Sequence, residues 1–290
     1  MSSQAEISLR FTRLKEISGI MTAMKSLSLV ETRKLARFIG HQRRMLANIE
    51  AAASDFLEHY PAGHTCGERP AILLLIGSER GFCGNFNERI LAALNDLPQR
   101  ESAPALLVLG HRLSARLEAH PDVIARLDGA SVTEDVPAVL NRLMDALHAA
   151  SRQLSGDGVT LYSLAHDSDG ETPRKRLLPL SPPPTSRRAH PPLLQLAPPE
   201  FFAELLDQYL LAAFYGLLYE SLAAENRQRL AHMENALQRL DETVARLAVK
   251  RNALRQEKIV EEIEVILSSE QAFAEAETEK FGTEINYKSR

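Results

Sequence analysis

The sequence predicts an α/β protein: a long antiparallel coiled coil of N- and C-terminal helices with an inserted small Rossmann-like α/β domain. Helical stretches form both ends of the chain, and strands alternate with short helices between them. Each end helix is too long for a compact domain, because an α-helix rises about 1.5 Å per residue. The expected segments are 1–60 (helix), 68–166 (α/β domain), 167–199 (connector) and 200–290 (helix and tail).

The C-terminal helix shows a coiled-coil seam. Its apolar residues alternate at intervals of three and four, at Leu230, Met233, Leu237, Leu240, Val244 and Leu247. We expect Leu237, Leu240 and Val244 to be mostly buried against the N-terminal helix. Charged residues such as Glu225 and Arg229 lie off the seam, so we expect them to face solvent. No proline follows Pro199, which favours one uninterrupted helix.

The N-terminal helix has a similar seam with a polar interruption. Its first seam residues are Leu14, Ile17, Met21 and Met24. Ser28 and Glu31 then occupy seam positions. Polar seam residues can fix the register of a coiled coil, or the helix can cross its partner loosely at this level, and the sequence leaves both open. Tyr60, Pro61 and Gly63 predict the end of the helix.

Between these helices, apolar runs of strand length alternate with helical segments. Residues 71–77 and 105–110 are continuous apolar runs, separated by the length of a βαβ unit. Further elements are expected as helices at 87–97, 111–120 and 134–154, a strand at 159–164, and weak strand or loop signals at 123–124 and 130–132. This alternation predicts a small parallel sheet with helices on its faces.

The segment that returns the chain to the long helix is rich in proline. Residues 166–199 hold nine of the 15 prolines, together with the basic run Arg174, Lys175 and Arg176. Proline lacks the backbone N–H that a central strand or a helix interior needs. We therefore interpret this segment as an extended connector.

The composition narrows the class of protein. The 290 residues are 44% hydrophobic and 25% charged, with a net charge of −4, so nucleic acid is not expected as the main ligand. No apolar run approaches the ~20 residues of a membrane span, and the polar N-terminus has no signal-peptide core. Cys66 and Cys83 are too few for a disulfide framework. We expect a cytosolic protein without direct membrane insertion.

A glycine-rich turn follows the first strand, with Gly77, Gly81 and Gly84. Such a turn can bind phosphate through its backbone N–H groups. The spacing matches neither the dinucleotide pattern nor the phosphate loop. It favours a tight turn with close helix packing, so we expect the α/β domain to bind no nucleotide.

No catalytic, metal or cofactor site emerges from the remaining residues. Cys83 could be a nucleophile, but its spacing to any histidine does not support this, and a small packed residue is the favoured interpretation. The histidines show no ligand spacing, for example His111, His120, His148, His166 and His190. The acidic residues near 257–264 are typical of a solvated helix face.

Three stretches together resemble the gamma subunit of F-type ATP synthase. They are LKEISGIMTAMKSLSLVETRKL (14–35), SERGFCGNFN (78–87), and the stretch from Tyr215 through YESLAAENRQRLAHMENAL to KRNALRQEKIVEEIEVIL (215–267). The first resembles the family's N-terminal helix and the second its signature turn DRGLCGGLN. The third resembles its ENLASExxxRMxAMxxA and YNxxRQxxITxEIxEI blocks. The motif LLPL (177–180) also fits.

This resemblance implies the central rotor shaft, a non-catalytic subunit. Such a shaft couples ion flow through a membrane c-ring to ATP synthesis or hydrolysis in the head. Its partners would be the alpha, beta and epsilon subunits and the c-ring, at the cytoplasmic face of the bacterial inner membrane. The resemblance also implies head contacts at Met24, Lys25, Arg255, Gln256 and Glu262.

The sequence also departs from the family pattern. Glu79 replaces an Asp and Asn85 a Gly in the signature turn, and Val260 and Val265 stand where the family has polar residues. These departures indicate a divergent or alternative branch. The alternative hypothesis is a stand-alone α/β ligand-binding module, possibly an enzyme, with a coiled-coil dimerisation arm.

The tail, 274–290, extends beyond the family's recognisable blocks. Its first residues are good helix formers, so we expect about two more helical turns. We expect Gly282 to end the helix, the last residues to fray, and the tail to dock on nothing tightly.

Overall fold

The computed structural model describes residues 4–60, 69–97, 103–154, 158–167, 169–180 and 190–287. The chain divides into two units: Met24–Glu234, and a second unit made of Met1–Ala23 with Asn235–Arg290. The positions expected to end the first helix, Pro61 and Gly63, lie outside the described residues, as does Cys66.

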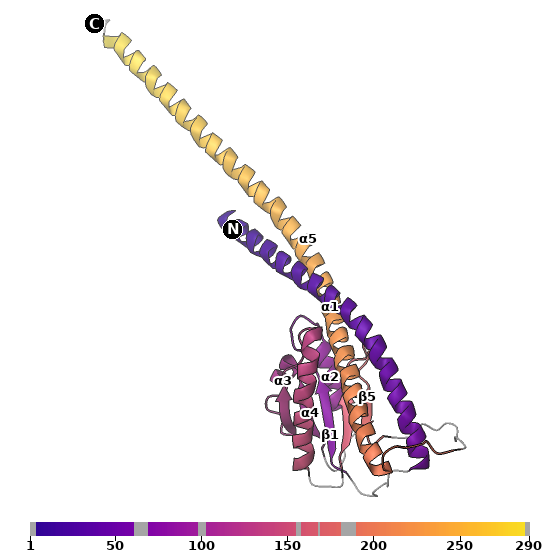
Figure 1. The fold of residues 1–290 in the computed structure, drawn as a ribbon. Helices are drawn as coiled ribbons and strands as arrows, with labels where there is room; N and C mark the ends of the chain where they lie inside the picture. Colours follow the sequence, from indigo (N-terminus) through magenta and orange to yellow (C-terminus); the bar gives the residue numbers. More distant parts are fainter. Residues whose placement is uncertain are drawn as a thin grey trace. The chain divides into compact units, whose positions relative to one another are not determined.

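Both predicted end helices are confirmed (Figure 1). Helix α1 spans Gln4–His59 and helix α5 spans Pro198–Tyr287. The expected stop at Gly282 is wrong, since the α5 backbone continues through that residue to Tyr287. A glycine inside a helix costs only about 1 kcal/mol relative to alanine, which does not suffice to end a helix on its own. The last three residues of the tail are not among those described.

The α/β elements between them include the predicted ones, in the predicted order, and a strand that was not predicted, β5. They are β1 (Ala71–Ile76), α2 (Phe86–Asn95), β2 (Ala105–Leu109), α3 (His111–Arg116), β3 (Val123–Leu127), η1 (Thr133–Asp135), α4 (Val136–Gln153), β4 (Thr160–Leu164) and β5 (Arg174–Leu178). The weak strand signal at 123–124 is the start of β3, whereas residues 130–132 form no strand.

The strands form one sheet in the order β3-β2-β1-β4-β5. The β1–β2, β2–β3 and β1–β4 pairs are parallel, and β5 is antiparallel to β4. The stretch read as a connector therefore also supplies an edge strand. Only one residue of β5, Leu177, is fully buried, and a basic edge strand of this kind leaves little apolar signal in the sequence. Residues 181–189 of the connector are not described.

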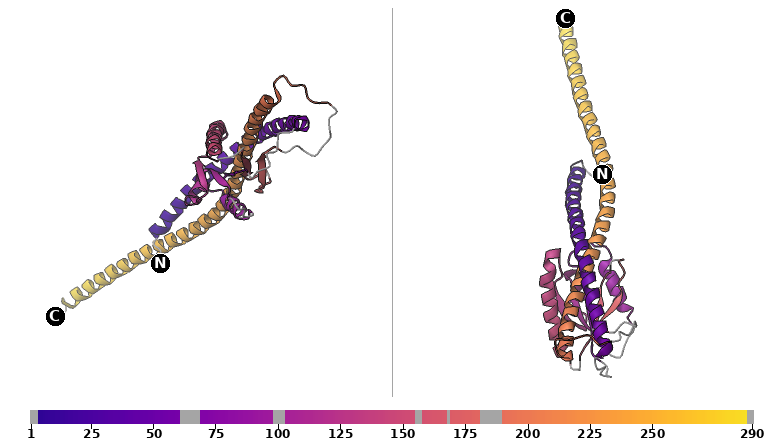
Figure 2. Two further views of the ribbon diagram at one scale, coloured as in Figure 1. Left: turned by 90° about the horizontal axis from the view of Figure 1, so that it is seen from below. Right: turned by 45° about the vertical axis from the view of Figure 1, so that its right-hand side comes forward.

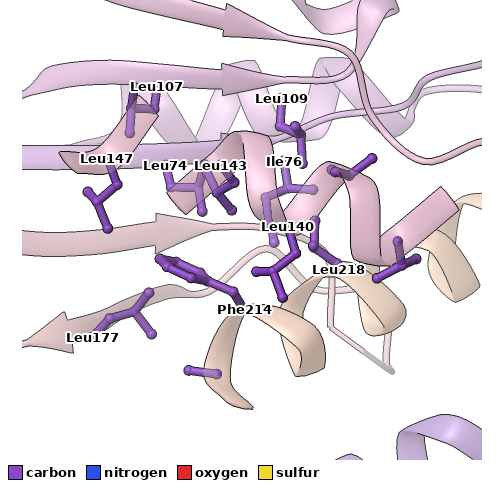
Figure 3. Close-up of a cluster of buried hydrophobic side chains, with 14 of the residues drawn as sticks. Leu74, Ile76, Leu107, Leu109, Leu140, Leu143, Leu147, Leu177, Phe214 and Leu218 are labelled. Atoms are coloured by element: carbon purple, nitrogen blue, oxygen red, sulfur yellow. The ribbon is translucent and has the colours of Figure 1, made fainter. Parts of the chain in front are cut away.

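The central strand β1 is buried on both faces, as its continuous apolar run predicts. Leu74 and Ile76 lie in the cluster shared with α4 and α5, which Figure 3 shows around Leu140, Leu143 and Phe214. Leu73 and Leu75 lie in the opposite cluster with residues of α2 and α3. The sheet is thus covered by helices on both sides.

Within the Met24–Glu234 unit, α1 and α5 run antiparallel (Figure 2). Three contacts that advance along α1 move backwards along α5: Lys25 with Glu234, Phe38 with Tyr219, and Phe56 with Phe201. Arg43 of α1 also pairs with Glu220 of α5. The two ion pairs join a basic side chain of α1 to an acidic one of α5. The predicted antiparallel pairing is confirmed here.

The seam residues of α5 are buried to different degrees. Met233 is fully buried, in the Met24–Glu234 unit. Leu237, Leu240 and Val244, in the other unit, are half-buried rather than mostly buried. In that unit the guanidinium carbon of Arg251 lies 4.5 Å from the ring centroid of Phe11, so the two terminal helices also meet there.

By length and composition alone, helix α5 could cross a membrane. The described part of it contains an 18-residue window with a mean hydropathy of 1.3, although the sequence has no apolar run of spanning length. Of this window, 39% is buried inside the protein. Phe214, Leu218 and Leu222 of α5 belong to the core cluster on the sheet, and a core helix has the same composition as a span.

Candidate functional site

The glycine-rich turn after β1 is built for close packing. A Cβ at Gly77 would lie 2.2 Å from Cβ of Leu113, so α3 can approach only a glycine here. Gly84 has φ +59°, the left-handed region that glycine favours. Inside the turn, Ser78 N–H donates to Asn87 Oδ1 at 3.0 Å, and this holds the turn against the start of α2.

The turn docks on a buried ion pair of α5. The backbone N–H groups of Glu79 and Arg80 donate to the carboxylate of Glu225, at 3.2 and 3.3 Å. Arg229, one turn further along α5, pairs with the same carboxylate and donates from Nε to the Gly81 carbonyl oxygen at 3.1 Å. Both side chains of the pair are 5% exposed. The carboxylate thus binds two backbone N–H groups of the turn, and the guanidinium binds a backbone carbonyl oxygen of the turn.

This arrangement corrects the expectation that Glu225 and Arg229 face solvent. Burial raises the pKa of the Glu225 carboxyl above its ordinary value, and the Arg229 guanidinium and the two N–H groups offset only part of this rise. A buried carboxylate without such partners would be strongly destabilising. Because this one has a cation and two backbone donors, the charged pair can remain inside the protein.

A second carboxylate fastens the turn to the sheet edge. Glu79 Oε2 accepts the N–H of His111 at 2.9 Å and the N–H of Gly129 at 2.7 Å. These two groups begin α3 and follow β3, respectively. Asn85, at the other end of the turn, accepts a hydrogen bond from Gln228 of α5 at 2.6 Å. Glu79 and Asn85, the two polar departures from the family turn, therefore both accept hydrogen bonds in this chain.

The phosphate-binding interpretation of the turn conflicts with this geometry. A phosphate would need the turn's backbone N–H groups, and those of Glu79 and Arg80 already serve the Glu225 carboxylate. The favoured interpretation from the sequence, a tight turn with close helix packing, agrees with these contacts.

The polar interruption in α1 is a docking point on the α/β domain. Glu31 Oε2 accepts the N–H and the hydroxyl of Thr133, at 3.0 and 2.8 Å. Lys34 bridges Glu31 and Glu134, with both N–O distances 3.0 Å. Ser28, one turn earlier, is buried. Of the two interpretations that the sequence left open, these contacts favour a specific polar junction over a loose crossing.

Burial alone would raise the pKa of Glu31. The hydrogen bonds from Thr133 and Lys34 outweigh it, so the pKa of this carboxyl lies below its ordinary value. The ionised form is therefore the one that the junction stabilises.

Cys83 fits the interpretation of a small packed residue. Its side chain is buried, burial raises the pKa of the thiol, and Sγ donates to the Arg80 carbonyl oxygen at 3.6 Å. A raised pKa disfavours the thiolate that nucleophilic catalysis requires. Within the described residues, no group of three or more His, Cys, Asp or Glu side chains could hold a metal ion.

Comparison with known proteins identifies the family. The family model for ATP synthase matches residues 3–273. The chain belongs to the ATP synthase gamma family. The ATP synthase gamma chain of Bdellovibrio bacteriovorus is 27% identical, over 94% of this chain and 99% of the relative, and that of Moorella thermoacetica is 24% identical over 94% and 99%. The gamma subunit is a non-catalytic stalk subunit.

Solved structures show the same fold. A chain of the Euglena gracilis mitochondrial ATP synthase, in a structure of OSCP, F1 and c-ring, aligns with a TM-score of 0.60. The alignment covers 93% of this chain and 94% of that one, at 12% identity. Because the gamma-family match includes both long helices and the α/β domain, the alternative of a stand-alone module with a dimerisation arm is not supported.

The five expected contact residues are divided between the two units. Lys25 forms its ion pair with Glu234 at 2.9 Å, and Met24 beside it is half-buried. Arg255, Gln256 and Glu262 lie in the other unit and are exposed. There, α5 reaches Phe11 of α1 at Arg251, one turn before Arg255. Arg251 thus contacts a residue of α1, Phe11, that precedes Met24 in the sequence.

Sequence reasoning missed the docking pair itself. Glu225 and Arg229 are four residues apart, a spacing that also occurs in ordinary exposed helix pairs. The available signal was the ENLASExxxRM block of the gamma family, which contains both residues at this spacing.

Proposed function

We propose that this gamma-family chain is the rotating shaft of an F-type ATP synthase at the cytoplasmic face of a bacterial inner membrane. It would couple ion flow through a c-ring to ATP synthesis or hydrolysis in a head of alpha and beta subunits, with an epsilon subunit beside it. The observation that supports this most is the family match through both long helices and the inserted domain. Relatives in the solved structures are parts of a central stalk with a c-ring and of a rotor.

A shaft must transmit torque between the c-ring, through which ions flow, and the head, where ATP is synthesised or hydrolysed. Here the α/β domain is joined to both helices, through Glu31 to α1 and through Glu225 and Arg229 to α5. Hydrogen bonds to charged groups are among the stronger ones in proteins. We infer that these two junctions make the domain turn together with the helices.

A rotor can act on the head without doing chemistry. A rod that presents a different face to each of three like sites interacts differently with each, and so shifts each site toward a different conformation. The residues proposed for this contact are Met24, Lys25, Arg255, Gln256 and Glu262. Gln256 and Glu262 are exposed on α5, and Glu262 forms an ion pair with Lys258 at 3.8 Å.

The contact assignment is tested by replacing Gln256 and Glu262 with alanine together. We expect the complex to assemble and coupled ATP synthesis in membrane vesicles to fall about tenfold, which corresponds to about 1.4 kcal/mol. Glu257→Ala with Glu261→Ala is the matched control, because both residues are exposed on the same stretch of helix. Equal synthesis rates in the wild type and the two double variants would show that Gln256 and Glu262 are not coupling contacts.

The proposed function itself is tested by purification. The tagged chain, expressed from its own genome, should bring down alpha and beta subunits in a complex that hydrolyses ATP, and should have no activity alone. A chain that purifies without these subunits would refute the proposal.

Val260 and Val265, both exposed and apolar where the family has polar residues, support placing the chain in a divergent branch.

A further inference from the structure

His166 is a buried histidine whose two ring nitrogens both face carbonyl oxygens. It follows β4 and is 2% exposed. Nε2 lies 2.9 Å from the carbonyl oxygen of Phe86, the first residue of α2. Nδ1 lies 3.2 Å from the carbonyl oxygen of Gly170, in the turn that leads to β5. The ring also packs on Phe86, with ring centroids 4.0 Å apart.

The number of protons on this ring decides how many of these contacts are hydrogen bonds. A neutral imidazole carries one N–H, so one ring nitrogen can donate and the other presents a lone pair to a carbonyl oxygen. A protonated ring donates from both nitrogens. The shorter contact, to Phe86, assigns the single proton of the neutral ring to Nε2. The contact to Gly170 is then favourable only in the protonated state.

The surroundings favour the neutral ring. Burial lowers the pKa of His166 below its ordinary value and Arg89 of α2 acts in the same direction, and the opposite effect of the two carbonyl groups and Asp167 offsets only part of this. Arg89 is itself paired with Glu171 of the turn, at 3.3 Å. Within the turn, the N–H groups of Asp169 and Glu171 donate to Asp167 Oδ1, both at 2.9 Å. The turn is tied to α2 by the Arg89–Glu171 pair, and His166, the residue before the turn, contacts α2 at Phe86.

We infer that His166 is a proton-operated latch between α2 and the turn before β5. The neutral ring donates one hydrogen bond, to the Phe86 carbonyl oxygen of α2. The protonated ring also donates to the Gly170 carbonyl oxygen in the turn. Acidification therefore adds a hydrogen bond between the segment that leads to β5 and the region of the signature turn. Phe86 is joined to that region directly, because its N–H donates to the Cys83 carbonyl oxygen at 3.3 Å. The latch is independent of the proposed shaft function.

The latch is tested by NMR on the full chain labelled with 15N-histidine. The His166 signals are assigned by their loss in His166→Gln, which keeps an amide N–H for the Phe86 carbonyl. On lowering the pH from about 8 to about 5, we expect Nε2 to stay protonated and Nδ1 to become protonated. A ring that carries its neutral proton on Nδ1, or that never gains the second proton before the chain unfolds, overturns the inference.

A second measurement follows the turn itself. Amide hydrogen exchange at Gly170 and Glu171 is compared between the wild type and His166→Gln at each pH, so that the intrinsic pH dependence of exchange cancels. We expect equal rates at pH 8 and slower exchange in the wild type, by about threefold or more, once His166 is protonated. His148→Gln, at an exposed histidine of α4, is the matched control and should follow the wild type. A ratio that does not change with pH would refute the latch.

Discussion

The buried pair of Glu225 and Arg229 makes a quantitative prediction. Replacing Glu225 by Gln keeps the shape of the side chain but leaves the Arg229 guanidinium without its buried counter-ion. The amide oxygen can still accept a backbone N–H of the turn, but the amide NH₂ then faces another donor. Breaking a buried ion pair in this way costs about 3–5 kcal/mol. That is a large share of the ~5–15 kcal/mol that stabilises a typical domain.

The control lies nine residues further along the same helix. Glu234 pairs with Lys25, but the two side chains are 53% and 36% exposed, so Glu234→Gln should cost about 1 kcal/mol or less. Urea denaturation of the full chain, followed by circular dichroism and by tyrosine fluorescence, measures both variants. The double variant Glu225→Gln, Arg229→Met removes the unpaired charge and should lose less than the sum of its single variants. If Glu225→Gln and Glu234→Gln differ by less than about 1 kcal/mol, the pair does not hold the turn.

Three further predictions concern α1, the seam and the turn. Because the pKa of Glu31 is lowered on folding, its contribution is present above the ordinary carboxyl pKa and is lost as pH falls through the folded value. Glu31→Gln should therefore lower the free energy of unfolding by about 1–3 kcal/mol at neutral pH, with the difference from wild type vanishing in acid urea titrations. Leu240→Asp should cost about 1–3 kcal/mol in the same assay, because Leu240 is half-buried. Leu267→Asp, at an exposed position, is the control and should have almost no effect. Equal costs of the two substitutions would contradict the predicted seam. Calorimetry of the full chain with ATP or NAD should show no binding tighter than about 1 mM, and micromolar binding would contradict our interpretation of the glycine-rich turn.

The sequence was most informative where one pattern extends over many residues. The heptad spacing and the lack of helix breakers predicted α1 and α5 nearly to their ends. The apolar run of β1 predicted a strand buried on two faces, because only such a strand needs apolar residues at successive positions. In these elements local propensity and burial favour the same structure, and no distant residue is needed to decide between alternatives.

Features that depend on a distant partner could not be predicted in this way. Glu225 is buried because two N–H groups of a turn 146 and 145 residues away donate to it, and periodicity along α5 contains no trace of that turn. The same holds for Glu31, whose partner Thr133 is 102 residues away. Strand β5 was missed for a related reason: its basic residues leave only Leu177 in the core. An edge strand is defined by its hydrogen bonds to β4 rather than by its own hydrophobicity.

The turn also shows why a glycine-rich sequence need not bind phosphate. Gly77 is required by the approach of Leu113, and Gly84 by its positive φ. Phe82 adopts φ 64° without being a glycine, and this conformation costs a non-glycine residue about 1–2 kcal/mol. The neighbouring N–H groups and the Gly81 carbonyl are bound by Glu225 and Arg229, so the strained turn is held by groups from α5. The glycines therefore allow close packing, and the backbone N–H groups of the turn bind the Glu225 carboxylate of the protein itself. In a phosphate loop such N–H groups would bind a phosphate from solution.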